Sequence, residues 1–193
     1  MASKKVEGRR PKLGGKRRFR PTALDARLRR VRLLLCDVDG VLTDGAVWMG
    51  NGAETKRFNI RDGLGLKMLQ HNGVKVGWVS RRPSSATQQR AKDLGIDFLT
   101  QSDSGKVAAV ESILQEAGCD WAEVCYVGDD IVDVGVLKRA GVSVVVADGV
   151  AEAKAVADCV TNAAGGHGAV REVAELILKA QRKWDRLLAE YAA

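Results

Sequence analysis

The chain has 193 residues, of which 46% are hydrophobic and 28% charged, a composition ordinary for a globular domain with one core. No apolar run approaches the roughly twenty residues of a membrane span, so we expect no membrane partner. The first 32 residues hold 13 of the 31 Lys and Arg but two of the 24 acids. The net charge of +7 therefore comes from a basic head, and the remainder of the chain carries −4.

Residues 1–22 are predicted to be a basic, disordered N-terminal extension that precedes a domain over residues 23–193. A basic arm can bind nucleic acid, but it is more often a solvated extension, so we expect no nucleic-acid partner. Residues 1–21 contain no apolar core of a signal peptide. The four cysteines show no C-x-x-C spacing and are expected to be free thiols, which predicts a cytoplasmic location.

Strand-like and helix-like segments alternate along the chain. A short helix over residues 23–30 precedes an apolar strand over 31–35, and a β-hairpin insertion over 46–58 bends at Asn51-Gly52. Further strands are expected over 74–79, 96–99, 124–127, 142–146 and 159–160. Further helices are expected over 62–72, with Asp62 as its cap, and over 84–94, 104–117, 134–140, 151–157 and 169–191. This alternation predicts an α/β, Rossmann-like fold with a parallel sheet and helices on both faces.

Polar residues follow several of these strands. In chain order they are Asp37, Asp39, Ser80, Arg82, Lys106, Asp129, Asp130 and Asp133. Taken singly, each residue also fits a solvated turn or a helix charge. Together they should meet, because parallel sheets collect such residues at the carboxyl ends of the strands. A hydroxyl, a lysine and a helix start suit a phosphate, and several carboxylates suit Mg²⁺.

The order of these residues resembles the haloacid-dehalogenase (HAD) superfamily, whose motifs are Asp-x-Asp-Gly, Ser or Thr, Lys, and Gly-Asp-Asp. More narrowly, residues 31–178 resemble the 3-deoxy-D-manno-octulosonate 8-phosphate (KDO 8-phosphate) phosphatases. The resemblance rests on DVDGVLTDG at 37–45, MGNG at 49–52, FNIRDG at 58–63, YVGDDIVD at 126–133, SVVVADGV at 143–150 and GGHGAVREV at 165–173. It implies a HAD fold without a cap domain and a homotetramer built through the hairpin.

The resemblance also implies roles for the residues. Asp37 would be the nucleophile that forms an aspartyl-phosphate, and Asp39 the general acid and base. Mg²⁺ would be held by Asp37, the backbone carbonyl of Asp39 and Asp129. Asp130 and Asp133 would orient metal waters and Lys106, while Ser80 and Lys106 hold the phosphoryl group. Substrate contacts would come from Asp39, Asn59, Ile60, Arg61, Asp62, Gly63, Lys67, Arg82 and Arg90.

The implied reaction is hydrolysis of KDO 8-phosphate to KDO and phosphate in lipopolysaccharide precursor biosynthesis. The chain departs from the family at Arg81, which stands where a glycine is usual, and at Lys67, which stands where Arg is common. Two alternatives stay open: a related phosphatase of a sialic-type acid 9-phosphate, and a tetramerising module of nucleotide-sugar synthesis. Arg90 also fits a solvated helix charge. Gly165–Gly168 fits either a plain loop or a segment that reaches a neighbouring site.

Overall fold

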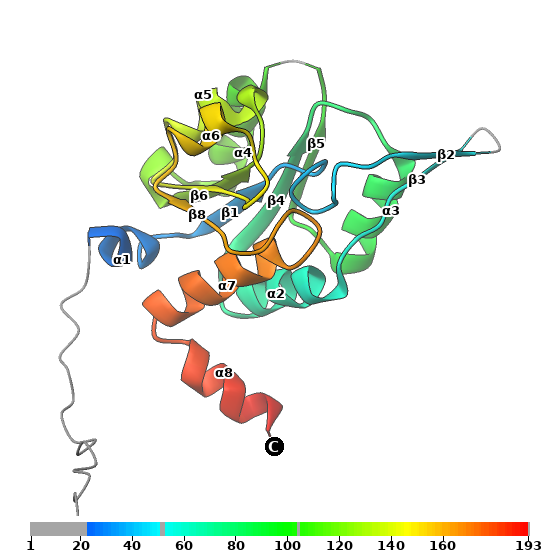
Figure 1. The fold of residues 1–193 in the computed structure, drawn as a ribbon. Coiled ribbons are helices and arrows are strands. Elements are labelled where there is room, and N and C mark those ends of the chain that lie inside the picture. The colour runs from blue at the N-terminus through cyan, green and yellow to red at the C-terminus, as the bar shows by residue number, and fades with distance from the viewer. Residues whose placement is uncertain (1–22, 51–52, 104, 193) are drawn as a thin grey trace, which may run out of the picture.

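Six parallel strands form the centre of the molecule in the computed structural model, which describes residues 23–50, 53–103 and 105–192 (Figure 1). The sheet order is β5-β4-β1-β6-β7-β8. The basic head, the hairpin bend at Asn51-Gly52 and Ser104 lie outside the described residues. The strands are β1 Leu33–Cys36, β4 Lys75–Ser80, β5 Phe98–Gln101, β6 Val124–Gly128, β7 Val142–Val145 and β8 Cys159–Val160.

Helices cover both faces of this sheet, as the alternation predicted. One face carries α1 Ala23–Leu28, α2 Ile60–His71, α3 Ser85–Leu94, α7 Ala169–Ala180 and α8 Trp184–Tyr191; the other carries α4 Lys106–Ala117, α5 Val134–Leu137 and α6 Ala151–Lys154. Strand β1 is buried on both faces because its side chains alternate between the two cores. Leu34 and Cys36 pack in the α2/α7 core, and Leu33 and Leu35 pack in the α4/α5 core. The predicted fold class is confirmed.

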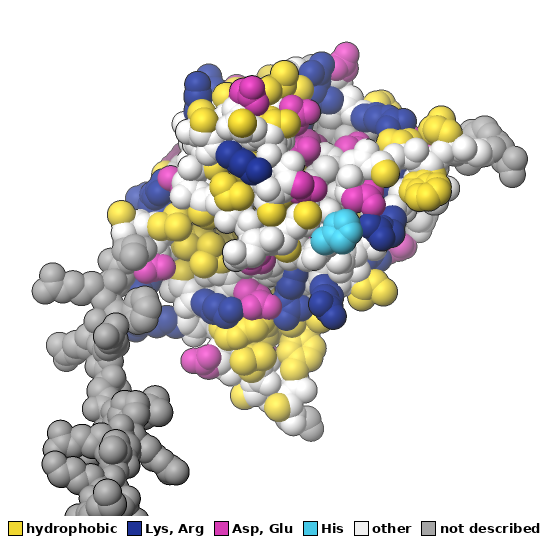
Figure 2. Space-filling model, viewed as in Figure 1, with side chains coloured by type: hydrophobic (Ala, Val, Ile, Leu, Met, Phe, Trp, Pro, Cys, Tyr) yellow, Lys and Arg dark blue, Asp and Glu magenta, His cyan; other side chains and the backbone are white. Residues whose placement is uncertain are grey.

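The β-hairpin projects from the body beside the carboxyl end of β1 (Figure 1). Its antiparallel strands are β2 Trp48–Gly50 and β3 Ala53–Thr55, so the paired strands cover less than the hairpin expected over 46–58. The return strand ends early because residues 56–58 run back onto the body, where Phe58 stacks on Trp78 at 6.0 Å between ring centroids. Figure 2 shows hydrophobic side chains on the projecting hairpin, where Trp48 is 68% exposed.

The predicted single helix over residues 169–191 is wrong, because the chain breaks between α7 and α8. Arg182 adopts a left-handed conformation with φ of 59°. The amide of Arg182 donates to the carbonyl of Lys179, and that of Lys183 donates to the carbonyl of Leu178. This is a Schellman end, which usually places glycine where Arg182 stands. The absence of a glycine is the reason that the break gave no signal in the sequence.

The start of α2 also differs from the prediction. Asn59, not Asp62, is the N-cap: its side chain accepts a hydrogen bond from the amide of Arg61 at 2.8 Å. Asp62 lies within the first turn of α2 and is 1% exposed. Its carboxylate accepts a hydrogen bond from the amide of Arg171 at 2.7 Å, near the start of α7. Asp62 therefore joins two helices that are distant in sequence.

Candidate active site

A polar pocket of about 190 Å³ lies at the carboxyl ends of β1, β4 and β6. Seven of the predicted site residues line it, together with Arg81 and Val132: Asp37, Asp39, Ser80, Arg82, Lys106, Asp129 and Asp130. The parallel topology brings these residues together, because each follows a strand or begins the helix after one. The expected convergence of the motifs at one sheet edge is therefore present.

Lys106 is the charged centre of this pocket, and its residue is only 5% exposed. Its ammonium lies 2.6 Å from Oδ2 of Asp37 and 2.6 Å from Oδ1 of Asp133. Burial alone would lower the pKa of Lys106, but the two carboxylates outweigh it and raise the pKa. Lys106 therefore stays charged beside Asp37.

Asp133 lies beneath the pocket, is 0% exposed, and has both oxygens occupied by donors. Oδ1 accepts from Lys106 and from the hydroxyl of Tyr126, each at 2.6 Å. Oδ2 accepts from the amides of Asp129 at 2.9 Å and Asp130 at 3.2 Å. Burial and the charge of Asp133 raise the pKa of Tyr126, so its hydroxyl remains a donor. Asp133 thus positions Lys106 and the loop after β6.

The remaining carboxylates of the pocket are crowded. Burial raises the pKa of Asp37 to about 6, against the opposing effect of Lys106. Burial, together with the charges of Asp37 and Asp133, raises the pKa of Asp129 to about 8. Oxygens of these three acids lie within 4.8 Å of one another, and Oδ1 of Asp129 is buried without a hydrogen-bond partner among the described residues. Because Asp133 is saturated by donors, Asp37 and Asp129 are the pair that fits a divalent cation.

Gly40 gives the loop after Asp37 the shape that this pair requires. Its φ is +87°, and a Cβ atom on it would lie 2.1 Å from Oδ2 of Asp129. A Cβ on Gly165 would likewise lie 1.8 Å from the carbonyl oxygen of Gly40. The two glycines thus allow three segments, which are far apart in sequence, to meet behind the pocket.

The Gly165–Gly168 segment contacts the first-motif loop of its own chain. The amide of Gly166 donates to the carbonyl of Val41 at 2.9 Å. His167 lies with Nδ1 at 2.7 Å from the carbonyl of Gly165 and Nε2 at 3.2 Å from the Arg57 guanidinium, which also pairs with Asp44 at 2.7 Å. Its expected reach into a neighbouring site stays a prediction.

The hairpin contributes two residues that the sequence analysis did not identify. The ammonium of Lys56 lies 2.7 Å from Oδ1 of Asp39, and Glu54 pairs with Arg82 at 2.6 Å. Both residues lie on the return side of the hairpin, two positions apart. That spacing places their side chains on one face of an extended segment, and it is the signal that could have identified them.

Residues 59–61, at the start of α2, do not line the pocket. Ile60 is 81% exposed, and Arg61 is exposed beside it. The side-chain amide of Asn59 donates to the carbonyl of Gly166 at 3.2 Å. Asp62 is buried against α7, as described above. Their substrate roles therefore stay predictions.

Three other predicted substrate residues lie between α2 and α3. A Cβ on Gly63 would meet the Arg90 guanidinium at 2.7 Å. The ammonium of Lys67 donates to the carbonyl of Leu94, the last residue of α3, at 3.0 Å. The structure thus groups these three residues with one another rather than with Asp37, and their substrate roles also stay predictions.

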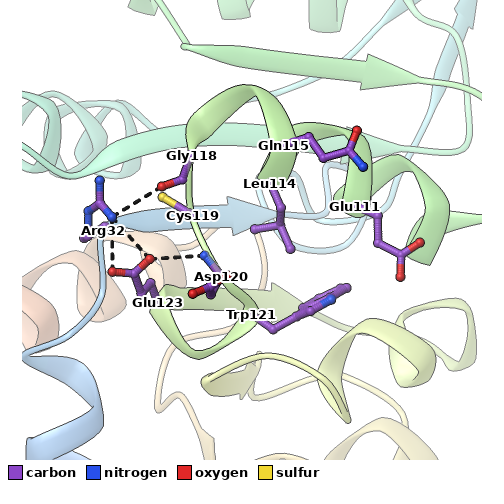
Figure 3. A pocket seen from close by; sticks show the side chains of 9 residues that line it. All are labelled: Arg32, Glu111, Leu114, Gln115, Gly118, Cys119, Asp120, Trp121 and Glu123. Atoms are coloured by element: carbon purple, nitrogen blue, oxygen red, sulfur yellow. Dashed lines mark hydrogen bonds and ion pairs between the residues drawn. The ribbon is translucent and has the colours of Figure 1, made fainter.

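A larger hollow of about 680 Å³ lies at the opposite, amino-terminal edge of β1 and β6 (Figure 3). Its one arginine, Arg32, is paired with Glu123 at 3.1 Å and donates to the carbonyl of Gly118. Among the described residues that line it there is no lysine and no group of convergent carboxylates. Its volume alone does not make it an active site, and the chemistry points to the smaller pocket.

Comparison with known proteins agrees with the geometry. A sequence profile of haloacid dehalogenase-like hydrolases matches residues 97–173. The 3-deoxy-D-manno-octulosonate 8-phosphate phosphatase of Yersinia pestis is 43% identical over 170 residues, covering 86% of this chain and 91% of that protein. The chain belongs to the KDO 8-phosphate phosphatase family. This match includes the Asp37 motif region, which the profile match does not.

Solved structures of this family share the fold. The phosphatase from Moraxella catarrhalis, in complex with magnesium, phosphate and KDO, has a TM-score of 0.85 at 37% identity; the match covers 87% of this chain and 97% of that one. The cobalt-bound phosphatase from Haemophilus influenzae has a TM-score of 0.79 at 37% identity, with 81% and 92% of the two chains covered. The family fold without a cap domain is therefore shown for this chain.

The close approach of Gly40 to Asp129 makes a testable prediction. Gly40→Ala should lower the free energy of unfolding by about 2–3 kcal/mol. Alanine disfavours the positive φ of this position, and its methyl group would also displace the Asp129 carboxylate. Gly73→Ala is a matched control, since Gly73 has φ of +81° and no atom within 4 Å of its Cβ position. It should cost about 1 kcal/mol. Urea denaturation measures both, and equal losses would contradict the proposed contact.

Proposed function

We propose that this protein is a Mg²⁺-dependent phosphatase that hydrolyses KDO 8-phosphate to KDO and inorganic phosphate. Membership of the family supports the reaction class. The observation that carries the proposal is the Asp37–Lys106 pair at the sheet edge, with Asp39 two residues on and Asp129 opposite. These groups provide a nucleophile, a phosphate-binding cation, a proton-transfer group and a second metal-binding carboxylate within one pocket.

The two carboxylates of the first motif have different roles: Asp37 is the nucleophile and Asp39 transfers protons. Asp37 attacks phosphorus, and the bond between phosphorus and the sugar oxygen breaks as that oxygen takes a proton from Asp39. A water molecule then gives a proton to Asp39 while its oxygen attacks the aspartyl-phosphate, which releases phosphate and restores Asp37. Lys106 and Ser80 would hold the phosphoryl oxygens; Ser80 is 2% exposed and lines the pocket.

Asp37, Asp129 and the backbone carbonyl of Asp39 would hold Mg²⁺. When bound, the metal neutralises the repulsion between the nucleophile and the phosphate. Two observations support this assignment: Oδ1 of Asp129 has no hydrogen-bond partner in the described part of the chain, and the pKa values of Asp37 and Asp129 are raised. A cation would stabilise the ionised form of both carboxylates. Asp130 lines the pocket and caps the following turn by accepting a hydrogen bond from the amide of Ile131, and we expect it to orient water at the metal.

Substrate recognition is expected from cations around the pocket mouth. Arg82 lines the pocket and is held by Glu54, and Arg81 lines it while paired with Asp103. A guanidinium suits the carboxylate of a sugar acid because it donates two parallel hydrogen bonds. The exposed Ile60 and Arg61 could reach substrate in the same or a neighbouring subunit.

We also propose a homotetramer assembled through the hairpin. Trp48 and Met49 are 68% and 73% exposed on the projecting strand β2 (Figure 2), and a lone two-stranded hairpin is marginal in water. A partner subunit that covers these side chains would stabilise it. Light scattering of the native protein should give four times the 20.8 kDa chain mass. A monomeric mass would contradict the proposal.

A cytoplasmic location is part of the same proposal, since free thiols suit a reducing compartment. The four cysteines, all within the described part of the chain, are unpaired. Among the described helices, none has the length and apolar character needed to cross a bilayer.

Substitutions should separate the roles of the carboxylates. Asp37→Asn should lower kcat by about a thousandfold or more, since no other group can replace the nucleophile. Asp39→Asn should lower it by about a hundredfold to ten-thousandfold.

Titration calorimetry with Mg²⁺ should show binding lost in Asp37→Asn and Asp129→Asn but largely kept in Asp39→Asn. The exposed Asp185 gives a control variant, Asp185→Asn. Equal loss of Mg²⁺ binding in Asp37→Asn and Asp39→Asn would contradict the division of roles.

The substrate is tested by phosphate release from a panel: KDO 8-phosphate, a nine-carbon sialic-type acid 9-phosphate, and glucose 6-phosphate. We expect Mg²⁺-dependent release with a higher kcat/KM for the two sugar acids than for glucose 6-phosphate, because only they carry a carboxylate for the pocket arginines. Family membership favours KDO 8-phosphate as the better of the two. A preference for the nine-carbon acid would select the alternative substrate. No release from either sugar acid would overturn the proposed function.

A further inference from the structure

The hairpin places a buried lysine directly against the predicted acid and base. The side chain of Lys56 is 0% exposed, and its ammonium lies 2.7 Å from Oδ1 and 2.9 Å from Oδ2 of Asp39. The Asp39 side chain is 27% exposed and lines the pocket. The ammonium donates a hydrogen bond to Oδ2 and lies within ion-pair distance of Oδ1, and these two contacts restrain both the rotation and the position of the carboxylate.

Glu54 completes this arrangement from the same face of the hairpin. One of its oxygens lies 3.4 Å from the Lys56 ammonium, and the other lies 2.6 Å from the Arg82 guanidinium. Its side chain is 14% exposed. Hydrogen bonding to Ser84 and the charge of Lys56 lower the pKa of Glu54 despite its burial. The hairpin is thus joined to the pocket by a continuous row of alternating charges: Asp39, Lys56, Glu54 and Arg82.

A purely structural explanation accounts poorly for the placement of Lys56. A buried ammonium is costly unless it is paired, and a hairpin could attach to the body through apolar contacts alone. Here the ammonium contacts Asp39, a carboxylate of the pocket that the Asp37–Lys106–Asp133 group does not hold. Among the described residues, no other side chain is seen to donate to Asp39.

We propose that Lys56 is a positioning residue, which holds the Asp39 carboxylate where it exchanges a proton with the leaving sugar oxygen and then with water. This inference rests on the phosphatase activity proposed above. In the first step the Asp39 proton passes to the oxygen as its bond to phosphorus breaks. In the second step a water proton passes to Asp39 as the water oxygen attacks the aspartyl-phosphate. Both transfers need Asp39 in one orientation, whereas the attack by Asp37 does not.

The test compares two leaving groups in Lys56→Met, which keeps the length of the buried stem. A sugar oxygen needs a proton to leave, but p-nitrophenolate does not. We expect kcat for the best sugar acid phosphate of the panel to fall by about a hundredfold or more. With p-nitrophenyl phosphate the first step should stay fast while water attack becomes slow. Stopped-flow measurement should then show a burst of about one p-nitrophenolate per active site.

Two variants accompany this measurement. Lys75→Met removes a lysine at the opposite edge of the sheet, where its ammonium donates to the carbonyl of Ala117. This control variant should keep the wild-type kcat on both substrates. Lys56→Arg keeps a donor beside Asp39, so its kcat on the sugar acid phosphate should be at least about tenfold higher than that of Lys56→Met. Equal losses on both substrates without a burst would mean that Lys56 is merely structural, and would overturn the proposal.

A crystal structure of Lys56→Met gives a readout that does not depend on activity. We expect the Asp39 side chain to leave its present orientation, while the contacts of Lys106 to Asp37 and Asp133 persist. An unchanged Asp39 orientation would overturn the positioning role even if the proposed substrate were correct. Failure of the wild-type protein to hydrolyse any sugar acid phosphate would instead overturn the proposed function, and the crystal structure would still decide the role of Lys56.

Discussion

The pairing of Lys106 with Asp37 and Asp133 is the interaction on which the rest of the site depends. A buried ammonium without partners would cost several kcal/mol, and here two carboxylates lie 2.6 Å from it. Asp133 is held in turn by Tyr126 and by two amides after β6. The end of β1, the start of α4 and the loop after β6 are therefore fixed relative to one another. Removal of Lys106 would leave two buried carboxylates without their cation, so the same contacts stabilise the fold and organise the chemistry.

Around this fixed centre the protein crowds carboxyl groups whose ionisation the fold opposes. Burial and the charge of Asp133 raise the pKa values of Asp37 and Asp129, and Gly40 lets the Asp129 carboxylate approach the backbone after Asp37. A divalent cation suits such a pair because it offsets the repulsion that the fold imposes. The hairpin adds the opposite element, since Lys56 supplies a positive charge to Asp39. The two carboxylates of the first motif thus face different electrostatic surroundings, which matches the different roles proposed for them.

Much of this could be predicted from local pattern. Every strand of the sheet was expected within a few residues, because short apolar runs alternate with helical segments and end at polar turns. The convergence of Asp37, Ser80, Lys106 and Asp129 followed from the rule that parallel strands end at one edge. The break at Arg182 could not be predicted, because an arginine takes the left-handed position that a glycine usually marks in a sequence. Asp62 was misassigned as a cap because its partner, the amide of Arg171, lies 109 residues away.

The sequence by itself determined the family, the sheet and the order of the motifs, because these depend on periodicity and on residues that are adjacent in the chain. Only the tertiary structure decided how the charges are shared. Lys56 reaches Asp39 because the chain folds back after the hairpin, and Asp133 is saturated because Lys106, Tyr126 and two amides converge on it. The Lys56–Asp39 and Lys106–Asp133 pairings join residues that are 17 and 27 positions apart, and no local pattern records such contacts.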